Sequence, residues 1–530
     1  MLETLISLLV NLLLVACGAL VLLYVAGTWN YDFFSRRGIP STRPRWPFAG
    51  DFLATFQGRS FVDVVGDLYA RGRGQGLFGV FELSARPLLM VRDPELIKVI
   101  AVKEFDSFVN HRSFASEKND PIMGRNLFNL KDQTWKDLRS TMSPAFTTSK
   151  IKTMMPLISQ CAAQFTATLR EKYLSSEEGA LEKPLESNMK DVFTRLTNDM
   201  IATAAFGVTT DSLKDPDNDF YTQGQRVTNF NPTYLFAYFT FPKLAEFLGL
   251  RIMDEESSNF FHNLVHGTMS ERQKRGIVRP DMLHMLMQAR EGRLTVEKQD
   301  AAEDERARGS ATKLTDNDIT ALSLIFFLGG LDTVSVALSF AAVVLAHHPD
   351  VQRRLQAEID DVWEEADGPP TYEAVHKMKY LDAVVSEVLR MYPPAFATDR
   401  ICQKDITLPA GAMSKPASIK KGTNVQFPII CLQNDPDYWS EPEKFDPERF
   451  NDENKHKIKP YTYIPFGLGP RLCIGQRFAL LELKVALGHL LRGFALLPSP
   501  RTAFPVEWAV GGAGISPKGG FWCGLAPRAH

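Results

Sequence analysis

The N-terminal segment contains the feature that most restricts how this chain can fold. From Leu5 to Trp29 the sequence carries no charged residue, and only Ser7, Asn11 and Thr28 interrupt the apolar side chains. At about 1.5 Å of rise per residue, a helix of this length crosses a hydrocarbon core of about 30 Å. The segment therefore predicts one N-terminal transmembrane helix.

Two further observations favour a retained anchor over a cleaved secretory signal. A signal peptide has a basic start and a shorter apolar core, whereas this chain opens with the sequence MLE. The first basic residues, Arg36 and Arg37, follow the apolar run, and the positive-inside rule then places the rest of the chain in the cytosol. We therefore expect residues 1–30 to be the membrane anchor of a single-pass protein.

The next segment has the composition of a linker. Residues 31–50 include Pro40, Pro44 and Pro47, and each proline fixes a backbone angle and removes a hydrogen-bond donor. We expect a stiff, basic, non-helical connector there. A catalytic domain is expected over residues 51–530.

Composition excludes some classes of function. A formal net charge of −2 over 530 residues gives no basic footprint for nucleic acid. The six cysteines are scattered with no C-x-x-C pair, which argues against a disulfide framework and a structural zinc site. Beyond residue 50, short β-branched pieces alternate with longer helical patterns, so we predict a mainly α fold with minor β.

Two stretches in the middle of the chain differ sharply in composition. Residues 210–250 are dense in aromatic side chains, and three interpretations fit them: core packing, the roof of a pocket, or a surface that dips into a membrane. Residues 291–313 are charged and poor in large apolar side chains. This second stretch predicts a solvated loop between helices.

A second long apolar segment follows that loop. Residues 315–318 have the hydroxyl and acids of a helix N-terminus, and from 321 to 346 the only charged residue is Asp332. Either a second membrane span or a central buried helix fits, but an ionised carboxylate at mid-membrane costs about 2.5–3.5 kcal/mol, which favours the buried helix. The glycine pair at 329–330 lets the helix open, so Asp332 and Thr333 are candidates for a proton relay.

An acid and a base lie three residues apart in the predicted helix 378–391. Glu387 and Arg390 share one face of that helix and can pair. A surface ion pair is the plain interpretation. Apolar neighbours such as Val384 and Leu389 indicate instead a buried pair that needs further partners.

The ten residues 466–475 form a loop whose glycines and proline force a tight turn. The loop delivers Cys473 to the start of a predicted helix over 477–491, where backbone N–H groups and the helix dipole favour a thiolate. Such a thiolate could be a nucleophile, a redox thiol or a soft-metal ligand, and no second cysteine or histidine lies nearby. A single anionic sulfur suits the axial ligand of a haem iron.

This loop resembles the haem-binding signature of the cytochrome P-450 superfamily, F-x-x-G-x-R-x-C-x-G, at all five fixed positions. The matching residues are Phe466, Gly469, Arg471, Cys473 and Gly475. Other elements resemble that family in the same order and spacing. They are the oxygen-activation motif at 329–333, the E-x-x-R motif at Glu387 and Arg390, the P-E-R-F region at 445–450 and the W-x-x-x-R element at Trp135 and Arg139.

The resemblance implies the cytochrome P-450 fold and one haem b. Cys473 would ligate the iron, and Thr333 and Asp332 would organise proton delivery during oxygen activation. The residues expected to form a structural ion-pair triad behind the haem are Glu387, Arg390 and Arg449. The other residues expected to contact the haem, several of them at its propionates, are Trp135, Arg139, Arg400, Phe466, Gly469, Arg471 and Gly475.

The implied reaction inserts one atom of O2 into a lipophilic small molecule with electrons from NADPH. Since the sequence shows no flavin-binding segment, the expected donor is a separate NADPH-dependent flavoprotein reductase, with cytochrome b5 as an optional second partner. Lys455, Lys457, Lys459 and Arg477 would suit an acidic partner, although a solvated face explains them equally well. The expected location is the endoplasmic reticulum membrane, with the catalytic domain in the cytosol.

Three short stretches, residues 279–282, 286–290 and 143–146, resemble the insect microsomal detoxification branch, which is related to the vertebrate drug-metabolising clan. This implies xenobiotics such as plant toxins or insecticides as substrates. A hormone, pheromone or odorant is the alternative substrate, and a haem isomerase or a lipophile-binding protein are alternative functions. By family position, the walls of an apolar pocket would come from residues 111–130, 229–241, 326–328, 395–398 and 510–516.

Overall fold

The computed structural model describes residues 2–44, 46–294, 313–366, 369–410, 415–511 and 514–528, so most of the predicted loop 291–313 lies outside the described residues. The chain divides into two compact units. The first joins Met1–Val109 to Ala397–Cys431, and the second joins Asn110–Phe396 to Leu432–His530. Helices dominate and small sheets complete the described part, which confirms the predicted mainly α fold with minor β.

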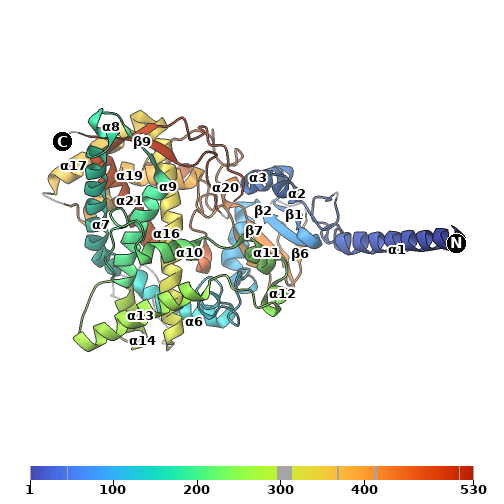
Figure 1. Ribbon diagram of the computed structural model, residues 1–530. Helices are drawn as coiled ribbons and strands as arrows, with labels where there is room; N and C mark the ends of the chain where they lie inside the picture. Colours follow the sequence, from blue (N-terminus) through green and yellow to red (C-terminus); the bar gives the residue numbers. More distant parts are fainter. Residues whose placement is uncertain are drawn as a thin grey trace. The chain divides into compact units, whose positions relative to one another are not determined.

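The predicted anchor is one continuous helix in the first unit. α1 (Leu2–Thr28) exposes its side chains from Thr4 to Ala26, and in Figure 1 it extends, in dark blue, away from the sheet of its own unit. An unburied apolar helix of this length fits a single transmembrane anchor. The chain packs onto its unit directly afterwards, because Phe34 is fully buried against Phe81.

Four strands form the main sheet of the first unit, in the order β1-β2-β7-β4. β1 (Leu77–Glu82) and β2 (Arg86–Val91) are antiparallel, β7 (Asn424–Phe427) runs parallel to β2, and β4 (Thr398–Ile401) runs antiparallel to β7. This unit also contains α2 (Leu53–Phe56), α3 (Phe61–Arg71), α4 (Pro94–Lys98), β5 (Ile406–Leu408) and β6 (Ala417–Ile419). Apolar side chains of α3 pack on β1 and β2 to form the core of the unit.

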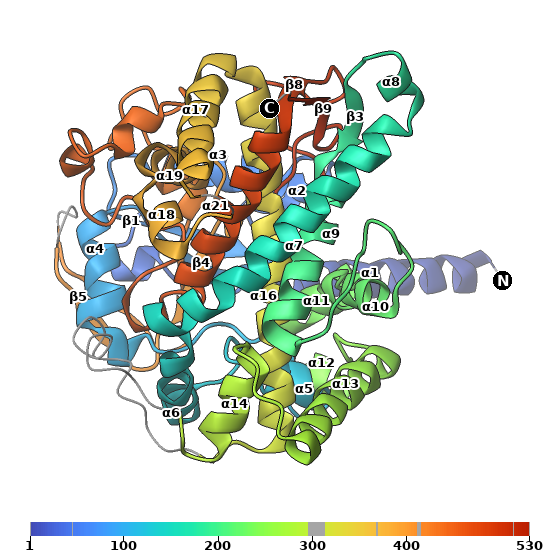
Figure 2. The same ribbon diagram turned by 90° about the vertical axis from the view of Figure 1, so that its left-hand side faces the viewer.

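The second unit is built around α16 (Asp316–His347). Thr315 is its N-cap and forms a reciprocal capping box with Asp318, as residues 315–318 predict. Most side chains along the helix are buried, which confirms the predicted central buried helix. α9 (Met189–Ile201), α13 (Glu255–Arg275) and α21 (Gln476–Gly493) pack against it, and α7 (Thr148–Leu174) packs against α21 (Figure 2).

Shorter helices and a three-stranded sheet complete the second unit. The helices are α5 (Pro121–Gly124), α6 (Asp132–Met142), α8 (Glu177–Ala180), α10 (Asp219–Thr228), α11 (Pro232–Thr240), α12 (Pro242–Phe247), α14 (Met282–Arg290), α17 (Pro349–Glu365), α18 (Tyr372–Lys377) and α19 (Lys379–Met391). The antiparallel sheet has the order β3 (Leu185–Asn188), β9 (Trp522–Pro527), β8 (Phe494–Pro498). α20 (Ile429–Leu432) lies where the chain passes from one unit to the other.

Four phenylalanines fix two helices on α16. Phe206, Phe220 of α10, Phe261 of α13 and Phe327 of α16 are at most 4% exposed, and their ring centroids lie 5.2–6.2 Å apart. Gly224 of α10 has no room for a side chain, because a Cβ there would collide with the ring of Phe327. Core packing therefore explains the first part of the aromatic stretch 210–250.

Candidate functional site

Two glycines shape the cysteine loop. Gly467 and Gly469 have φ angles of 73° and 72°, in the left-handed region where a Cβ is unfavourable. The loop closes where the N–H of Cys473 donates to the carbonyl oxygen of Phe466 at 3.0 Å. Gly475 is the N-cap of α21, so the cysteine lies just before a helix, as predicted.

The Cys473 thiol is accessible and yet recessed. Its side chain is exposed, whereas desolvation by the surrounding protein raises the pKa of the thiol above its ordinary value. The side chain is therefore accessible although the surrounding protein desolvates its sulfur. The N–H of Gly475 and the charge of Arg139 act to lower the pKa, so the predicted stabilisation of a thiolate is present but weaker than the desolvation.

Three of the predicted haem-contacting residues come together beside this loop. The guanidinium of Arg471 lies over the ring of Trp135, 3.8 Å from its centroid, and donates to the carbonyl oxygen of Leu130 at 2.9 Å. Arg139, one turn beyond Trp135 on α6, donates to the carbonyl oxygen of Leu472 at 2.9 Å. Two arginines thus join α6 to the residues that precede the cysteine.

The middle of α16 is its most open part. Thr333 and Asp332 are exposed in a helix that is otherwise mostly buried. The hydroxyl of Thr333 donates to the carbonyl oxygen of Gly329 at 2.5 Å and so bonds back to the preceding turn. The carboxylate of Asp332 accepts from Nζ of Lys190 on α9 at 2.7 Å, and the same Nζ donates to Ser335 at 2.6 Å. The candidate acid is therefore half of an ion pair between α9 and α16.

A stacked aromatic pair connects α16 with the start of α21. The rings of Phe326 and Phe146 are stacked, with centroids 4.7 Å apart. Phe146 also lies 4.0 Å from the position that a Cβ of Gly475 would occupy. One ring therefore spans the space between the end of the cysteine loop and the turn of α16 that precedes Gly329.

Glu387, Arg390 and Arg449 also come together, and here the buried interpretation of the acid–base pair holds. Glu387 and Arg390 are both fully buried, and two hydrogen bonds of 2.7 and 2.9 Å join their side chains. Nε of Arg449 lies 3.4 Å from the Glu387 carboxylate. Arg390 also donates to the carbonyl oxygens of Gln433 and Pro442, each at 2.9 Å, so the buried charges have the further partners that burial demands.

Arg400 alone among the predicted site residues belongs to the first unit, where it lies on β4. Its side chain is 1% exposed and donates to the carbonyl oxygen of Asp399 at 2.6 Å. Burial lowers the pKa of Arg400 to about 10, and the charge of Asp399 opposes that shift. A buried guanidinium of this kind favours a neighbouring anion.

Two of the predicted pocket walls meet through aromatic rings. Phe114, in the range 111–130, lies 6.0 Å from Phe230, in the range 229–241, between ring centroids. Neither residue is fully buried, so both rings remain partly accessible. The range 510–516 falls partly outside the described residues.

The aromatic stretch ends in an exposed apolar surface on and beside α12. The exposed fractions are 46% for Phe241, 51% for Leu244, 83% for Phe247 and 60% for Leu248. Large apolar side chains gathered in one place on a surface indicate contact with lipid or another apolar partner. A surface role therefore fits the last part of the stretch better than core packing does.

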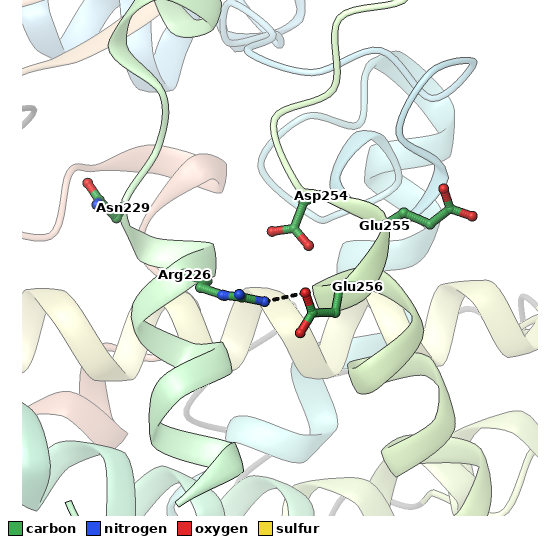
Figure 3. Close-up of a pocket in the computed structure, with 5 residues that line it drawn as sticks. All are labelled: Arg226, Asn229, Asp254, Glu255 and Glu256. Atoms are coloured by element: carbon green, nitrogen blue, oxygen red, sulfur yellow. Dashed lines mark ion pairs between the residues drawn. The ribbon is translucent and has the colours of Figure 1, made fainter. Parts of the chain in front are cut away.

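A pocket of about 520 Å³ opens between the end of α10 and the start of α13 (Figure 3). Its lining residues are Arg226, Asn229, Asp254, Glu255 and Glu256. Arg226 pairs with Glu256 at 2.6 Å, and the remaining carboxylates make the lining acidic. Such a lining suits water and cations, and not a lipophilic ligand.

The sequence interpretation missed two charged residues near the centre of the second unit. Lys190, the partner of Asp332, lies 142 positions away along the chain. Glu482 on α21 is fully buried, and neither of its carboxylate oxygens has a hydrogen-bond partner within the described part of the chain. The apolar neighbours Leu481 and Leu483 were the only local sign that this acid might be buried.

Known proteins resemble the chain over almost its whole length. The family model described as Cytochrome P-450 matches residues 40–523. Cytochrome P-450 9e2 of Blattella germanica is 46% identical over 96% of each chain. Probable cytochrome P-450 9f2 of Drosophila melanogaster is 42% identical over 96% of this chain and 98% of its own. Cytochrome P-450 3A11 of Mus musculus is 37% identical over 92% of this chain and 91% of its own. These relatives confirm the resemblance to the insect detoxification branch and to the vertebrate drug-metabolising clan.

Proposed function

Because the chain belongs to the cytochrome P-450 family, we propose that it is a membrane-bound enzyme that inserts one oxygen atom from O2 into lipophilic xenobiotics such as plant toxins or insecticides. Membership makes it a haem-thiolate monooxygenase that acts on xenobiotics or other lipophiles. The observation that carries the proposal is the recessed thiol of Cys473. The ring of Phe146 connects its loop with the open turn of α16 that bears Thr333.

The residues around Cys473 fit a haem. No group of three or more His, Cys, Asp or Glu side chains within the described ranges could hold a metal ion, so a lone sulfur donor suits one axial bond better than a zinc shell. Arg139 and Arg471 supply cations for anionic propionates. We assign iron ligation to Cys473, haem contact to Phe466, Gly469 and Gly475, and propionate contact to Trp135, Arg139, Arg400 and Arg471. When bound, haem b supplies the oxygen chemistry.

Thr333 and Asp332 are assigned to proton delivery. The hydroxyl proton of Thr333 is committed to the carbonyl oxygen of Gly329, which leaves its oxygen to accept a hydrogen bond from water. Asp332 is exposed and paired with Lys190, so this pair can exchange protons with solvent at the side of α16 that faces α9.

The triad of Glu387, Arg390 and Arg449 is assigned a positioning role. Arg390 of α19 donates hydrogen bonds to the carbonyl groups of Gln433 and Pro442. These two residues lie in the segment that leads toward the cysteine loop. Replacing one member would leave a buried charge without its partner, which costs about 3–5 kcal/mol. The triad thus supports the loop without touching the substrate.

Electrons would come from NADPH through a separate flavoprotein reductase, with cytochrome b5 as an optional partner. Lys457, Lys459 and Arg477 are exposed and suit an acidic docking partner. Lys455 contributes less, since it pairs with Asp452 at 2.6 Å. Residues 1–30 would anchor the protein in the endoplasmic reticulum membrane. Residues 31–50 would link this anchor to the cytosolic catalytic domain, which residues 51–530 would form.

The first test is the spectrum of the expressed full-length protein, reduced under carbon monoxide, beside Cys473→Ser. We expect the red-shifted Soret band of thiolate-ligated ferrous haem in the wild type and its loss in the variant. Cys161→Ser, which removes a half-buried thiol of α7, is the matched control and should keep the band. A histidine-type band or a protein without haem would contradict the proposal.

A second test separates the substrate classes. The protein, reconstituted with an NADPH reductase, would be offered lipophilic toxins and insecticides beside hormones and pheromones, with product identification. We expect oxygenated products, and NADPH consumption, chiefly with the xenobiotics. Preference for an endogenous lipophile would favour the alternative substrate, product without NADPH would indicate an isomerase, and binding without product would indicate a binding protein.

A further inference from the structure

Asn11 is a polar residue of the anchor that the proposed function leaves unexplained. It lies on α1, within the candidate span Thr4–Thr28, and its side chain is exposed. Residue 16 is midway between positions 4 and 28, so Asn11 lies about 7.5 Å from the middle of the span, well inside a hydrocarbon core of about 30 Å. An amide that faces lipid has no water to bond with, which makes it costly without a partner.

Gly18 is a second residue of α1 whose type is not required by its own chain. A Cβ at this position would meet nothing within 4 Å in the described part of the protein. Glycine also weakens a helix compared with alanine. Gly27 differs, because a Cβ there would lie 2.6 Å from Cβ of Pro47 and would collide with it. The side of α1 at Gly18 is therefore open to close approach by another helix.

Asn11 and Gly18 lie on one face of α1. They are seven residues apart, which is two helical turns, and Ser7 lies four residues before Asn11. Residues at spacings of three, four and seven form the contact line between two helices that cross at about 20°. This face, the α1 seam, consists of Ser7, Asn11, Leu14, Gly18, Val21 and Val25, and all six are exposed.

The α1 seam is complementary to a second copy of itself. All copies of α1 cross the membrane in the same direction and at the same depth, so a twofold axis places identical residues opposite each other. An asparagine amide both donates and accepts hydrogen bonds, so two Asn11 side chains satisfy each other. Gly18 opposite Gly18 allows the two backbones to approach closely. A helix of another protein would need a polar group at the same depth to do the same.

We infer that two copies of the protein pair in the membrane through the α1 seam, with a hydrogen bond between the Asn11 side chains and a close backbone contact at Gly18. The inference rests on the membrane anchorage that the proposed function includes, but not on any step of the reaction. A single interhelical hydrogen bond is weak. The pairing is therefore reversible and depends on the density of the protein in the membrane.

Energy transfer between labelled copies measures this pairing. Two batches of the full-length protein would carry a donor or an acceptor fluorescent protein at the C-terminus and share the same phosphatidylcholine vesicles. We expect wild-type copies to transfer energy, and unlabelled wild-type protein to compete the signal away. Dilution with lipid should lower the transfer along a binding curve. Transfer that unlabelled protein does not compete away would be random proximity and would overturn the inference.

Single substitutions in α1 test the two contacts of the seam. Asn11→Leu removes the amide and should lower the association constant about 3- to 20-fold, the range expected for one interhelical hydrogen bond. Asn11→Gln keeps an amide and should retain most of the transfer. Gly18→Leu separates the two backbones and should also lower the transfer. The matched control Ala16→Leu adds a similar bulk to an exposed position away from the seam and should leave the transfer unchanged.

The outcomes separate this inference from the proposed function. Every variant should stay in the membrane fraction on alkaline extraction and keep the carbon monoxide band. If they do, and Asn11→Leu and Gly18→Leu transfer energy like the wild type, or Ala16→Leu loses as much transfer as Gly18→Leu, only the pairing is overturned.

A different occupant of the seam would also be visible. If wild-type copies show no transfer and Asn11→Leu instead weakens binding of the reductase in the same vesicles, the seam serves the reductase and the second copy is overturned. If alkaline extraction releases the wild type from the membrane, the proposed anchorage and this inference are overturned together.

Discussion

α1 and α16 are both long and apolar enough to cross a membrane, but they have opposite surroundings. No residue is buried in the most apolar window of α1, whereas 61% of the corresponding window of α16 is buried in the second unit. Hydropathy therefore shows that a helix avoids water, and not whether lipid or protein covers it. Each of the two helices is essential to a different part of the proposed function.

Polar residues separate the two helices more clearly than length does. α16 carries Asp332, which pairs with Lys190, and Ser339, which donates to the carbonyl oxygen of Ser335 at 2.6 Å. Residues 5–28 of α1 contain no charged side chain that would need such a partner. A charged group at a fixed point on an apolar helix therefore indicates protein contact.

Deleting residues 2–28 should have the largest effect, because a transmembrane helix holds a protein almost irreversibly. We expect the truncated protein to move from the membrane fraction into the soluble fraction on alkaline extraction. The carbon monoxide spectrum should remain, since α16 belongs to the second unit. If the truncated protein stays in the membrane fraction, the exposed residues of α12 hold it there and α1 is not the sole anchor.

The same substitution placed in each helix should give opposite results. Val343 of α16 is fully buried and Val15 of α1 is 72% exposed. Val343→Lys should cost about 4 kcal/mol or more in unfolding free energy, because it buries an unpaired charge. Val15→Lys should leave that free energy unchanged and weaken membrane insertion by about 2.5–3.5 kcal/mol. Urea unfolding and alkaline extraction would measure the two effects, and equal results at both sites would contradict the distinction.

Acid should destabilise the helices around α16 but not α1, which has no histidine or carboxylate in residues 5–28. His489 of α21 is buried beside Ser159, and burial lowers its pKa from 6.5 to about 4. Between pH 4 and pH 6.5 the unfolded chain binds more protons at His489 than the folded chain does. The contribution of His489 to the free energy of unfolding is therefore fully present above pH 6.5 and falls toward pH 4. The loss is about 3 kcal/mol.

The variant His489→Gln keeps a polar group near Ser159 and removes the titration. It should flatten the fall in unfolding free energy between pH 6.5 and 4, as measured by urea unfolding at each pH. The α1 deletion is the control and should reproduce the wild-type profile. An unchanged slope in His489→Gln would assign the acid sensitivity to other groups.

The smallest effect on stability is expected for the ion pair that distinguishes α16. The side chains of Lys190 and Asp332 are 29% and 54% exposed, so Lys190→Met should change the unfolding free energy by less than about 1 kcal/mol. Product formed per NADPH should fall more noticeably, because the exposed acid loses its partner. Arg275→Met, which breaks an exposed pair with Glu271, should affect neither measurement. A cost of several kcal/mol for Lys190→Met would mean that the pair is mainly structural.

Features whose partners are close in the chain could be predicted from the sequence. The cap of α16 needs only Thr315 and Asp318, three residues apart, and the buried pair of Glu387 and Arg390 has the same spacing. The tight cysteine loop follows from local glycines, of which Gly467 and Gly469 adopt positive φ. Short-range geometry limits such side chains to a few arrangements.

Partners that are distant in the chain could not be predicted in this way. Lys190 is 142 residues from Asp332, and Arg471 is 341 residues from the carbonyl of Leu130. The burial of Glu482 depends on how α21 packs on α16, and a single acid in a helix is ordinarily solvated. The sequence motifs therefore identified the candidate groups, while tertiary packing decided what each group contacts.

The close approach of Gly224 to the ring of Phe327 constrains directed evolution of this enzyme. α10 is followed by one of the predicted pocket walls, so libraries that aim to change substrate range would naturally randomise it. Any side chain at 224 meets the aromatic ring on α16, so most such clones would be lost as unfolded protein. Libraries that also place a smaller side chain at position 327 would recover them, so the effect of a substitution at 224 depends on the residue at 327.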